Sequence, residues 1–177
     1  MKKSILLSFT AIAALFISAC GNNQPAQEEN HDGHDHSKTE ATSTIQLNDD
    51  KLNAVYQEYI KLNTALINSD AEAAKIAANT LELGAKELEN GSASVASAIK
   101  ITEAESIKDA REAFSELSNE MIALVKESGL KSGELYVDYC PMALNDTGGY
   151  WLSNEKGIRN PYFGKSMMTC GETKETI

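Results

Sequence analysis

Several residue types that often build active sites are scarce in this chain of 177 residues. It contains three His, three Cys and one Trp, and aromatic residues make up 6% of the sequence. All three His lie between positions 31 and 36, so no imidazole elsewhere can act as a general base. The sequence also lacks a Walker loop, a dinucleotide-binding loop and a CxxC motif. These absences predict a protein that is not an enzyme.

Positive charge and long apolar runs are also in short supply. The chain has 16 Lys and Arg against 26 Asp and Glu, which gives a net charge of -10. A nucleic-acid partner is therefore not expected, because phosphates require a basic face. No uninterrupted apolar run is long enough to predict a membrane-spanning helix. The acidic surface fits ordinary solvation, with attraction of cations as the alternative.

The first residues have the pattern of an export signal. Lys2 and Lys3 precede an apolar stretch from Ile5 to Ile17, which ends in Ile17-Ser18-Ala19-Cys20. This pattern resembles a bacterial lipoprotein signal, with cleavage before Cys20 and a lipid on its thiol. The alternative is an ordinary secretory signal. In both cases we expect a cell-envelope protein outside the cytoplasm. With the lipid, it would face the periplasm and reach the membrane by its anchor only. Gly21 favours the outer over the inner membrane.

A polar segment from 20 to 44 follows the predicted signal peptide, which spans 1–19. It has almost no apolar residues and cannot bury enough surface to fold, so it predicts a flexible tether. His31, His34 and His36 lie close together in it. Imidazoles at this spacing bind Zn or Cu(II) weakly, which predicts a secondary site for metal capture. The alternative is a polar linker that happens to carry His.

The region from about 45 to 127 lacks Pro and predicts helices. Apolar residues repeat at steps of three and four in three stretches, which is the pattern of one buried helix face. The stretches are Leu52 to Leu66, Ala74 to Leu88 and Ile107 to Leu124. A short helix is expected over 92–101. The predicted fold class is therefore all-α, an antiparallel bundle of three long helices and a short one, within a domain spanning 45–177. A coiled-coil dimer is the alternative.

Capping signals set the expected ends of these helices. Ser69-Asp70-Ala71-Glu72 and Thr102-Glu103-Ala104-Glu105 both have the form of a capping box and predict helix starts. Asn90-Gly91 and Gly129 predict helix ends. Arg111 lies near an apolar stripe, and we expect it to pair with an acid of a neighbouring helix.

The segment 134–177 differs in composition from the helical region. It holds four of the six Tyr, the only Trp, three of the five Met and two of the three Cys. A short strand over 135–137, which could belong to a β-hairpin, and otherwise irregular structure are expected. Two sulfur clusters stand out, Cys140-Pro141-Met142 and Met167-Met168-Thr169-Cys170. Thiolates and thioethers select soft ions, so these five sulfur-bearing residues predict a site for Cu(I) or Ag(I). In an extended chain Cys140 and Met142 would point the same way.

A disulfide is the competing interpretation of the two cysteines. Once Cys20 carries a lipid, Cys140 and Cys170 remain as a pair in a compartment where disulfides persist. Closing that loop would stabilise the fold by about 3–4 kcal/mol in the chain-entropy model. Structural zinc is less favoured, because the folded part has no His and no CxxC. Trp151 could cover the ion with its ring. Trp151, Tyr162 and Phe163 are the candidates for site cover or partner contact.

The C-terminal motifs resemble a known family. They are Tyr139-Cys140-Pro141-Met142-Ala143, Trp151-Leu152-Ser153, Ile158-Arg159-Asn160-Pro161-Tyr162-Phe163-Gly164, Met167 and Cys170-Gly171. From about Leu47 to the end, the chain resembles a domain of unknown function common in Bacteroidetes. That domain occurs in small lipoproteins and fused to the C-terminus of heavy-metal (copper/silver) efflux periplasmic adaptor subunits. The resemblance implies metal handling, with Cys140, Met142, Met167 and Cys170 in the family motif and Met168 as a further sulfur.

Two functions follow as hypotheses. The first is a lipid-anchored protein that binds Cu(I) in copper or heavy-metal efflux, with an efflux adaptor or pump as its partner. The second is a non-catalytic interaction module, in which a Cys140–Cys170 disulfide supports an aromatic loop that docks an envelope or efflux partner. The first requires thiols that take up metal, and the second requires a stable disulfide.

Overall fold

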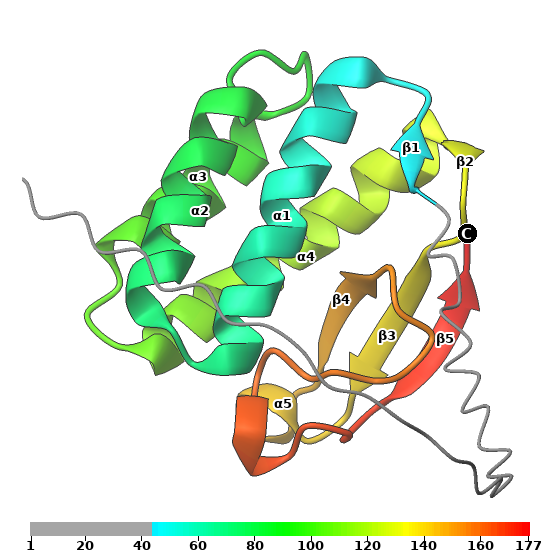
Figure 1. The fold of residues 1–177 in the computed structure, drawn as a ribbon. Coiled ribbons are helices and arrows are strands. Elements are labelled where there is room, and N and C mark those ends of the chain that lie inside the picture. Colours follow the sequence, from blue (N-terminus) through cyan, green and yellow to red (C-terminus); the bar gives the residue numbers. More distant parts are fainter. Residues whose placement is uncertain (1–43) are drawn as a thin grey trace, which may run out of the picture. The chain divides into compact units, whose positions relative to one another are not determined.

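The computed structural model describes residues 44–177, and four helices make up most of this part. They are α1 (Asp50–Asn68), α2 (Ala71–Ala85), α3 (Ser92–Glu103) and α4 (Ile107–Ser128). Each helix packs against the next along the chain (Figure 1). The expected helical bundle is confirmed, with the 12-residue α3 as its short helix.

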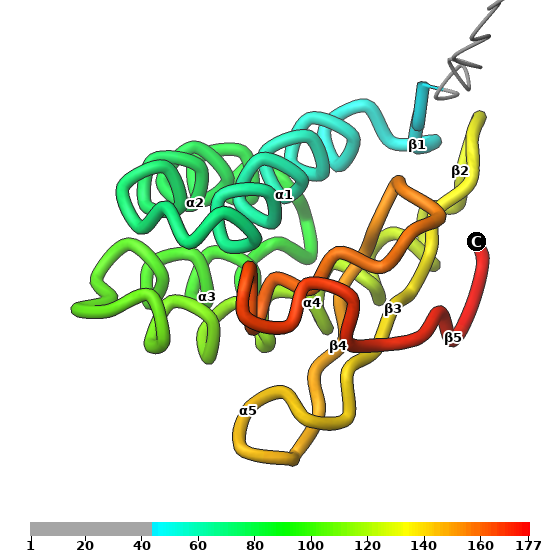
Figure 2. Tube along the Cα trace, turned by 60° about the horizontal axis from the view of Figure 1, so that its bottom comes forward, coloured from blue at the N-terminus to red at the C-terminus, as the bar shows by residue number. Residues whose placement is uncertain are grey.

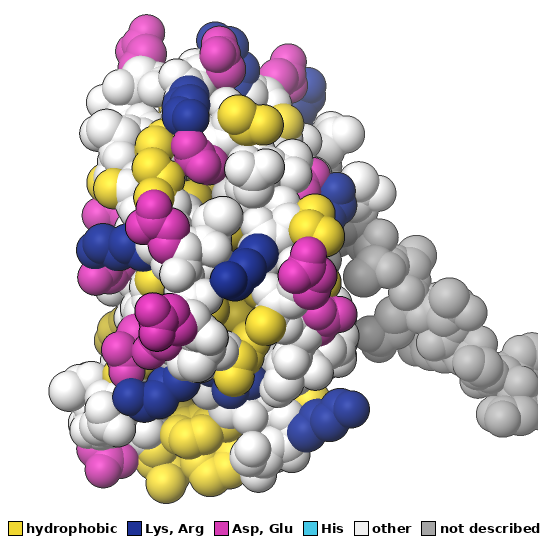
Figure 3. Space-filling view, turned by 90° about the vertical axis from the view of Figure 1, so that its left-hand side faces the viewer, with side chains coloured by type: hydrophobic (Ala, Val, Ile, Leu, Met, Phe, Trp, Pro, Cys, Tyr) yellow, Lys and Arg dark blue, Asp and Glu magenta, His cyan; other side chains and the backbone are white. Residues whose placement is uncertain are grey.

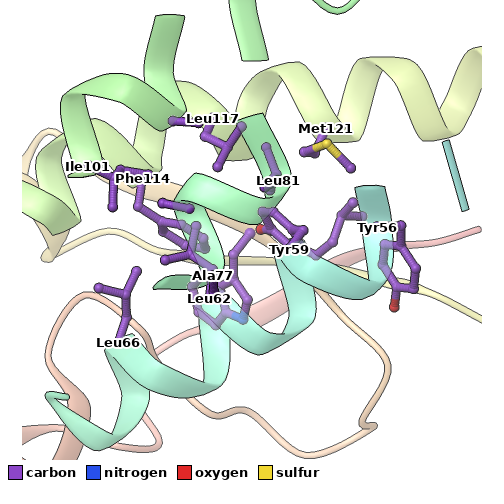
Figure 4. Close-up of a cluster of buried hydrophobic side chains, with 14 of the residues drawn as sticks. Tyr56, Tyr59, Leu62, Leu66, Ala77, Leu81, Ile101, Phe114, Leu117 and Met121 are labelled. Atoms are coloured by element: carbon purple, nitrogen blue, oxygen red, sulfur yellow. The ribbon is translucent and has the colours of Figure 1, made fainter. Parts of the chain in front are cut away.

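The predicted apolar faces form the core of the bundle. Residues from all four helices are fully buried there, among them Leu62, Leu81, Ile101 and Leu117, which Figure 4 labels. The rings of Tyr59 and Phe114 stack with centroids 5.3 Å apart. Met121 is fully buried in the same core, as expected for a packing residue. The steps of three and four between apolar residues predicted these buried positions, because an amphipathic helix buries one face.

Two of the predicted helix starts are displaced. Ser69 ends α1 in a left-handed conformation with φ 59, and Asp70 instead caps α2 by accepting from the Ala73 N–H. Helix α3 runs on through Thr102, whose hydroxyl bonds the Ala98 carbonyl, so Ser106 caps α4 with Asp109. Both errors arise where a helix begins right after the previous one ends, so that several Ser, Thr and Asp residues compete for the cap.

Of the two predicted helix ends, one is confirmed and the other is displaced. Gly129 follows α4 with φ 73 and donates its N–H to the Val125 carbonyl, so the predicted C-cap is confirmed. Helix α2 ends at Ala85, before the predicted Asn90-Gly91. A Cβ on Gly91 would lie 1.9 Å from the Ala85 carbonyl oxygen, so this glycine serves a close backbone approach in the following turn.

The all-α description is only partly right, because antiparallel strands flank the helices. Two short strands pair with each other, β1 (Gln46–Leu47) and β2 (Leu130–Ser132). Three more form a sheet in the order β4-β3-β5, with β3 at Tyr136–Cys140, β4 at Gly149–Ser153 and β5 at Glu172–Thr176. Strand β5 is exposed at all five positions, so it lacks the apolar alternation that would have revealed it.

This sheet packs beside the helices and completes the domain. Strand β4 contacts α4, and the tube in Figure 2 shows β3, β4 and β5 beneath the level of α1. The last residue, Ile177, exchanges two backbone hydrogen bonds with Leu135, so the end of the chain lies next to the start of β3. The segment that differs in composition is therefore ordered by pairing across 30 to 40 residues of sequence.

Candidate functional site

The central observation is a contact between two cysteines. The Sγ atoms of Cys140 and Cys170 lie 2.7 Å apart, and both residues are free thiols in this structure. A disulfide bond measures about 2.05 Å, so no bond joins the sulfurs here, but the two thiols lie close enough to be joined by oxidation. The tertiary structure thus brings together two of the five sulfur-bearing residues that the sequence singled out.

Different elements carry these two thiols. Cys140 is the last residue of β3 and pairs with Gly149 of β4. Cys170 closes a turn in which its N–H donates to the Met167 carbonyl at 3.2 Å. Gly171 follows with φ 138 and lies against the Trp151 ring, where a Cβ would come within 2.9 Å of the ring. Only glycine allows the chain to pass so close to Trp151 and lead from Cys170 into β5.

A buried asparagine holds the Cys170 segment in position. Asn160 is fully buried and donates from Nδ2 to the Cys170 carbonyl at 2.7 Å. Its N–H donates to the Met168 carbonyl, and its Oδ1 accepts from the N–H groups of Tyr162 and Phe163. An Asn-Pro pair is a turn signal, and such a signal does not reveal the distant partner of the asparagine side chain. The Asn160 network fixes the backbone on both sides of the turn.

Hydrogen bonds donated by Arg111 join the segment around Pro161 to the helical bundle. Arg111 of α4 donates from Nε to the Pro161 carbonyl at 2.7 Å and from Nη2 to the Leu66 carbonyl at 2.9 Å. Burial lowers the pKa of the Arg111 guanidinium. The expected partner, an acid of a neighbouring helix, is wrong. The Leu66 carbonyl near the end of α1 and the Pro161 carbonyl take that place, and the C-terminal end of a helix carries partial negative charge.

Exposure differs between the two thiols. Cys140 is fully buried, whereas Cys170 is half-buried and can meet solvent. The hydrogen bond with Cys140 raises the pKa of the Cys170 thiol to about 11. A thiol with a raised pKa is a poorer nucleophile at neutral pH than one with an ordinary pKa.

The three methionines lie around the thiols in the sequence but differ in setting. Strand β3 ends at Cys140, and Met142 has φ -86 and ψ -7, so the expected extended chain through Met142 is wrong. Met142 is 49% exposed and lines a surface cavity. Met167 and Met168 are half-buried, and Met167 begins the turn that Cys170 closes.

The three aromatic candidates differ in exposure. Trp151 is fully buried, and Tyr162 is 6% exposed and donates its hydroxyl to the Tyr150 carbonyl at 2.6 Å. Their rings meet edge to face with centroids 5.9 Å apart. Phe163 is half-buried and lines the same cavity as Met142. Of the three, Phe163 has the side chain best able to touch a partner.

The strand that carries Cys140 also contains a buried acid that the sequence analysis did not single out. Asp138 is fully buried in β3, and its Oδ1 accepts from the Thr173 hydroxyl at 2.7 Å. Its Oδ2 and the Trp151 Nε1 have no hydrogen-bond partner among the described residues. Loss of hydration raises the pKa of the Asp138 carboxyl. A polar residue inside an otherwise apolar strand was the available signal.

Other predicted features lie outside the described residues. These are the signal peptide, the lipidation residue Cys20 and the three histidines His31, His34 and His36. Within 44–177, no group of three His, Cys, Asp or Glu is arranged to hold a metal ion. In this same part of the chain, no helix has both the length and the apolar character needed to cross a membrane.

Comparison with known proteins identifies part of the chain. Residues 55–133 match the family model described as "Protein of unknown function (DUF3347)". This match confirms that the chain contains a domain of unknown function. It covers most of α1 through β2 and ends before β3, so it does not include the thiol pair. No curated protein matches the chain, and no solved structure does.

Proposed function

We propose that this protein is a lipid-anchored protein of the cell envelope that binds Cu(I), or the similar Ag(I), as cargo in copper or heavy-metal handling. The observation that carries the proposal is the 2.7 Å contact between the sulfurs of Cys140 and Cys170. Two thiolates held side by side are strong soft donors, and soft donors favour Cu(I) over hard cations. The exposed side of Cys170 gives an ion access to the pair.

The choice of further donors also favours a soft ion. Structural zinc usually takes four Cys or His ligands, and residues 44–177 offer no third His, Cys, Asp or Glu near this pair. Thioethers are then the donors left to complete a site, and they bind Cu(I) better than Zn. Met167, which shares the Cys170 turn, is the first candidate, with Met142 and Met168 after it.

The proposed setting rests on sequence patterns. Lipidation of Cys20 would anchor the chain, and residues 20–44 would act as a tether that carries His31, His34 and His36. We propose that these imidazoles capture Zn or Cu(II) weakly and that the sulfur site takes the soft ion. The resemblance to domains fused to efflux adaptors supports an efflux adaptor or pump as the partner, with the outer membrane as the favoured location.

Anaerobic native mass spectrometry tests the metal proposal. The sample is the Cys20→Ser protein, isolated from periplasm after cleavage of its signal peptide, then mildly reduced and given Cu(I). We expect one retained copper, lost in Cys140→Ser and Cys170→Ser and weakened in Met167→Leu. Met121→Leu is the matched control, because Met121 is fully buried in the helical core. Failure of the reduced protein to retain copper would contradict the proposal.

A second candidate function rests on the same contact. Thiols this close are readily joined by oxidation, and envelope compartments sustain disulfides. The protein would then be a non-catalytic interaction module whose disulfide fixes the segment that carries Phe163. It predicts a mass two hydrogens lower in the isolated protein, no copper uptake without reduction, and loss of partner capture in Phe163→Ala. Tyr162→Phe serves as the control, since Tyr162 is almost fully buried.

A further inference from the structure

The surface of the molecule has a cavity that neither Cys140 nor Cys170 lines. The cavity has a volume of about 420 Å³ and lies between the start of α4, the loop that joins β3 to β4, and residues 162–163. Small-molecule sites in proteins commonly occupy about 300–1,000 Å³. Three segments that are distant in the sequence therefore converge on a hollow of suitable size.

One part of the cavity wall is apolar. Met142, Leu144 and Phe163 contribute to its lining, and Met142 is among the few large apolar side chains that are strongly exposed in the described residues. Figure 3 shows hydrophobic side chains gathered at the lower end of the molecule, with Lys and Arg side chains directly above them. Two short elements, α5 (Ala143–Asp146) and η1 (Gly164–Ser166), lie at that end in Figure 1. Flexible Met side chains adapt to ligands of varied shape.

The loop on this wall is held in a strained conformation. Leu144, Asn145 and Asp146 have φ values of 55, 57 and 66, so three successive residues that are not glycine are left-handed. The Gly148 N–H donates to the Ala143 carbonyl at 2.9 Å, which closes the loop. Left-handed backbone is costly for a residue such as Leu, and strain of this kind occurs where surrounding structure fixes a ligand site.

The charges that line the cavity divide into one pair and two single groups. Lys108 and Glu112 neutralise each other, with Nζ and Oε1 3.1 Å apart. Arg111 bonds only carbonyl and hydroxyl oxygens and has no carboxylate partner among residues 44–177. Asp146 forms no ion pair in that range either. A formally neutral cavity thus contains one positive and one negative side chain, Arg111 and Asp146, that have no ion-pair partner among residues 44–177 and come from different segments.

We infer that this cavity binds a free α-amino acid with a large apolar side chain. The carboxylate of such a ligand matches the Arg111 guanidinium, and its ammonium group matches the Asp146 carboxylate. Its side chain covers Met142, Leu144 and Phe163 and removes their apolar surface from water. A net anion or a net cation would satisfy only one of the two free charges. This inference does not depend on copper binding.

Three matched probes test the ligand class by isothermal titration calorimetry on the full-length protein. L-phenylalanine carries both charges, 3-phenylpropanoate lacks the ammonium group, and 2-phenylethylamine lacks the carboxylate. We expect saturable binding of L-phenylalanine and at least about fivefold weaker binding of the other two. Equal binding of all three probes, or no binding of L-phenylalanine, would overturn the inference.

Variants separate a specific site from apolar adsorption. Asp146→Asn removes the charge at a left-handed position that Asn tolerates, so the loop should persist. We expect it to weaken L-phenylalanine binding about fivefold and to leave 3-phenylpropanoate binding unchanged. Leu144→Gly relieves the strained φ and removes part of the apolar wall, so it should also weaken binding. An unchanged L-phenylalanine affinity in both variants would overturn the inference.

Two controls identify where a signal arises. Asp50→Asn changes an exposed acid of α1 outside the cavity and should leave binding unchanged. Cys140→Ser and Cys170→Ser should abolish copper retention while the binding of L-phenylalanine stays within about twofold of the parent value. Loss of amino-acid binding in a folded Cys170→Ser protein would instead assign it to the thiol site and overturn the inference.

Discussion

Asn160 donates its side-chain amide to the backbone carbonyl of Cys170, with Nδ2 and O 2.7 Å apart. The contact spans ten residues and fixes the carbonyl of the residue whose thiol meets Cys140. The Asn160 side chain thereby positions the backbone that carries the Cys170 thiol, although Asn160 is not itself a metal-ligand candidate.

Replacing this asparagine should loosen the site. In Asn160→Ala, the Cys170 carbonyl and the Tyr162 and Phe163 N–H groups lose their partner in a buried setting. We expect the free energy of unfolding to fall by about 2–4 kcal/mol, measured by urea denaturation. Asn68→Ala, at an exposed position, is the control and should change stability by less than about 0.5 kcal/mol. Equal effects of the two substitutions would contradict the assigned role of Asn160.

Arg111→Lys tests the fastening of the C-terminal segment to the bundle. Lysine keeps the charge but cannot reproduce the planar set of donors that reaches Pro161 and Leu66 together. We expect a loss of about 1–3 kcal/mol in the free energy of unfolding. Arg159→Lys is the matched control, because Arg159 forms an exposed pair with Glu155. A stability loss in Arg159→Lys as large as that in Arg111→Lys would count against the fastening.

Two glycines give a paired test of backbone geometry. Gly164 has φ 57, and a Cβ there would lie 2.7 Å from the Ile67 carbonyl oxygen. Gly164→Ala should therefore lower the thermal midpoint and cost about 2–4 kcal/mol. At Gly157, an added Cβ would meet no atom of the described residues within 4 Å, so Gly157→Ala should be neutral or stabilising by up to about 1 kcal/mol. A tolerated Gly164→Ala would mean that the segment can move away from α1.

Asp138 should make stability depend on pH. Its pKa is raised by burial, so folding favours the neutral carboxyl. This contribution is complete below the unfolded pKa of about 3.9 and is lost as pH rises through the higher folded pKa. Asp138→Asn should thus gain stability relative to the parent as pH rises above the unfolded pKa of about 3.9. Urea denaturation across this range measures the difference.

A control separates Asp138 from acids in general. Glu89→Gln removes an exposed carboxylate from the loop after α2 and serves as the control. If Asp138→Asn and Glu89→Gln gave the same pH profile, burial of Asp138 would not be the cause.

Copper affinity should rise with pH if Cys170 is a ligand. The pKa of its thiol is raised to about 11, so binding at neutral pH must displace a proton. One displaced proton corresponds to about a tenfold gain in affinity per pH unit below that pKa. Competition with a Cu(I) chelator between pH 6 and pH 9 measures the slope. A copper affinity that does not rise with pH over this range would exclude Cys170 as a ligand.

Local sequence patterns were enough to predict the helices. The helices follow from local physics, because steps of three and four between apolar residues require one buried face whatever the neighbours are. The C-cap at Gly129 and the shift in composition at 134 were also readable from the chain. The helix starts at Asp70 and Ser106 were not, since adjacent Ser, Thr and Asp residues offer the helix several caps of similar strength.

The site depended on tertiary structure. Sequence determined that thiols and thioethers are concentrated in the last 44 residues, but two cysteines 30 residues apart could lie anywhere. Pairing of β3 with β4 and β5, together with the bonds of Asn160 and Arg111, decided that Cys140 and Cys170 meet. These are long-range hydrogen bonds, from backbone to backbone in the sheet and from side chain to backbone at Asn160 and Arg111. They leave no periodic trace in the sequence, and only the folded chain reveals which groups they join.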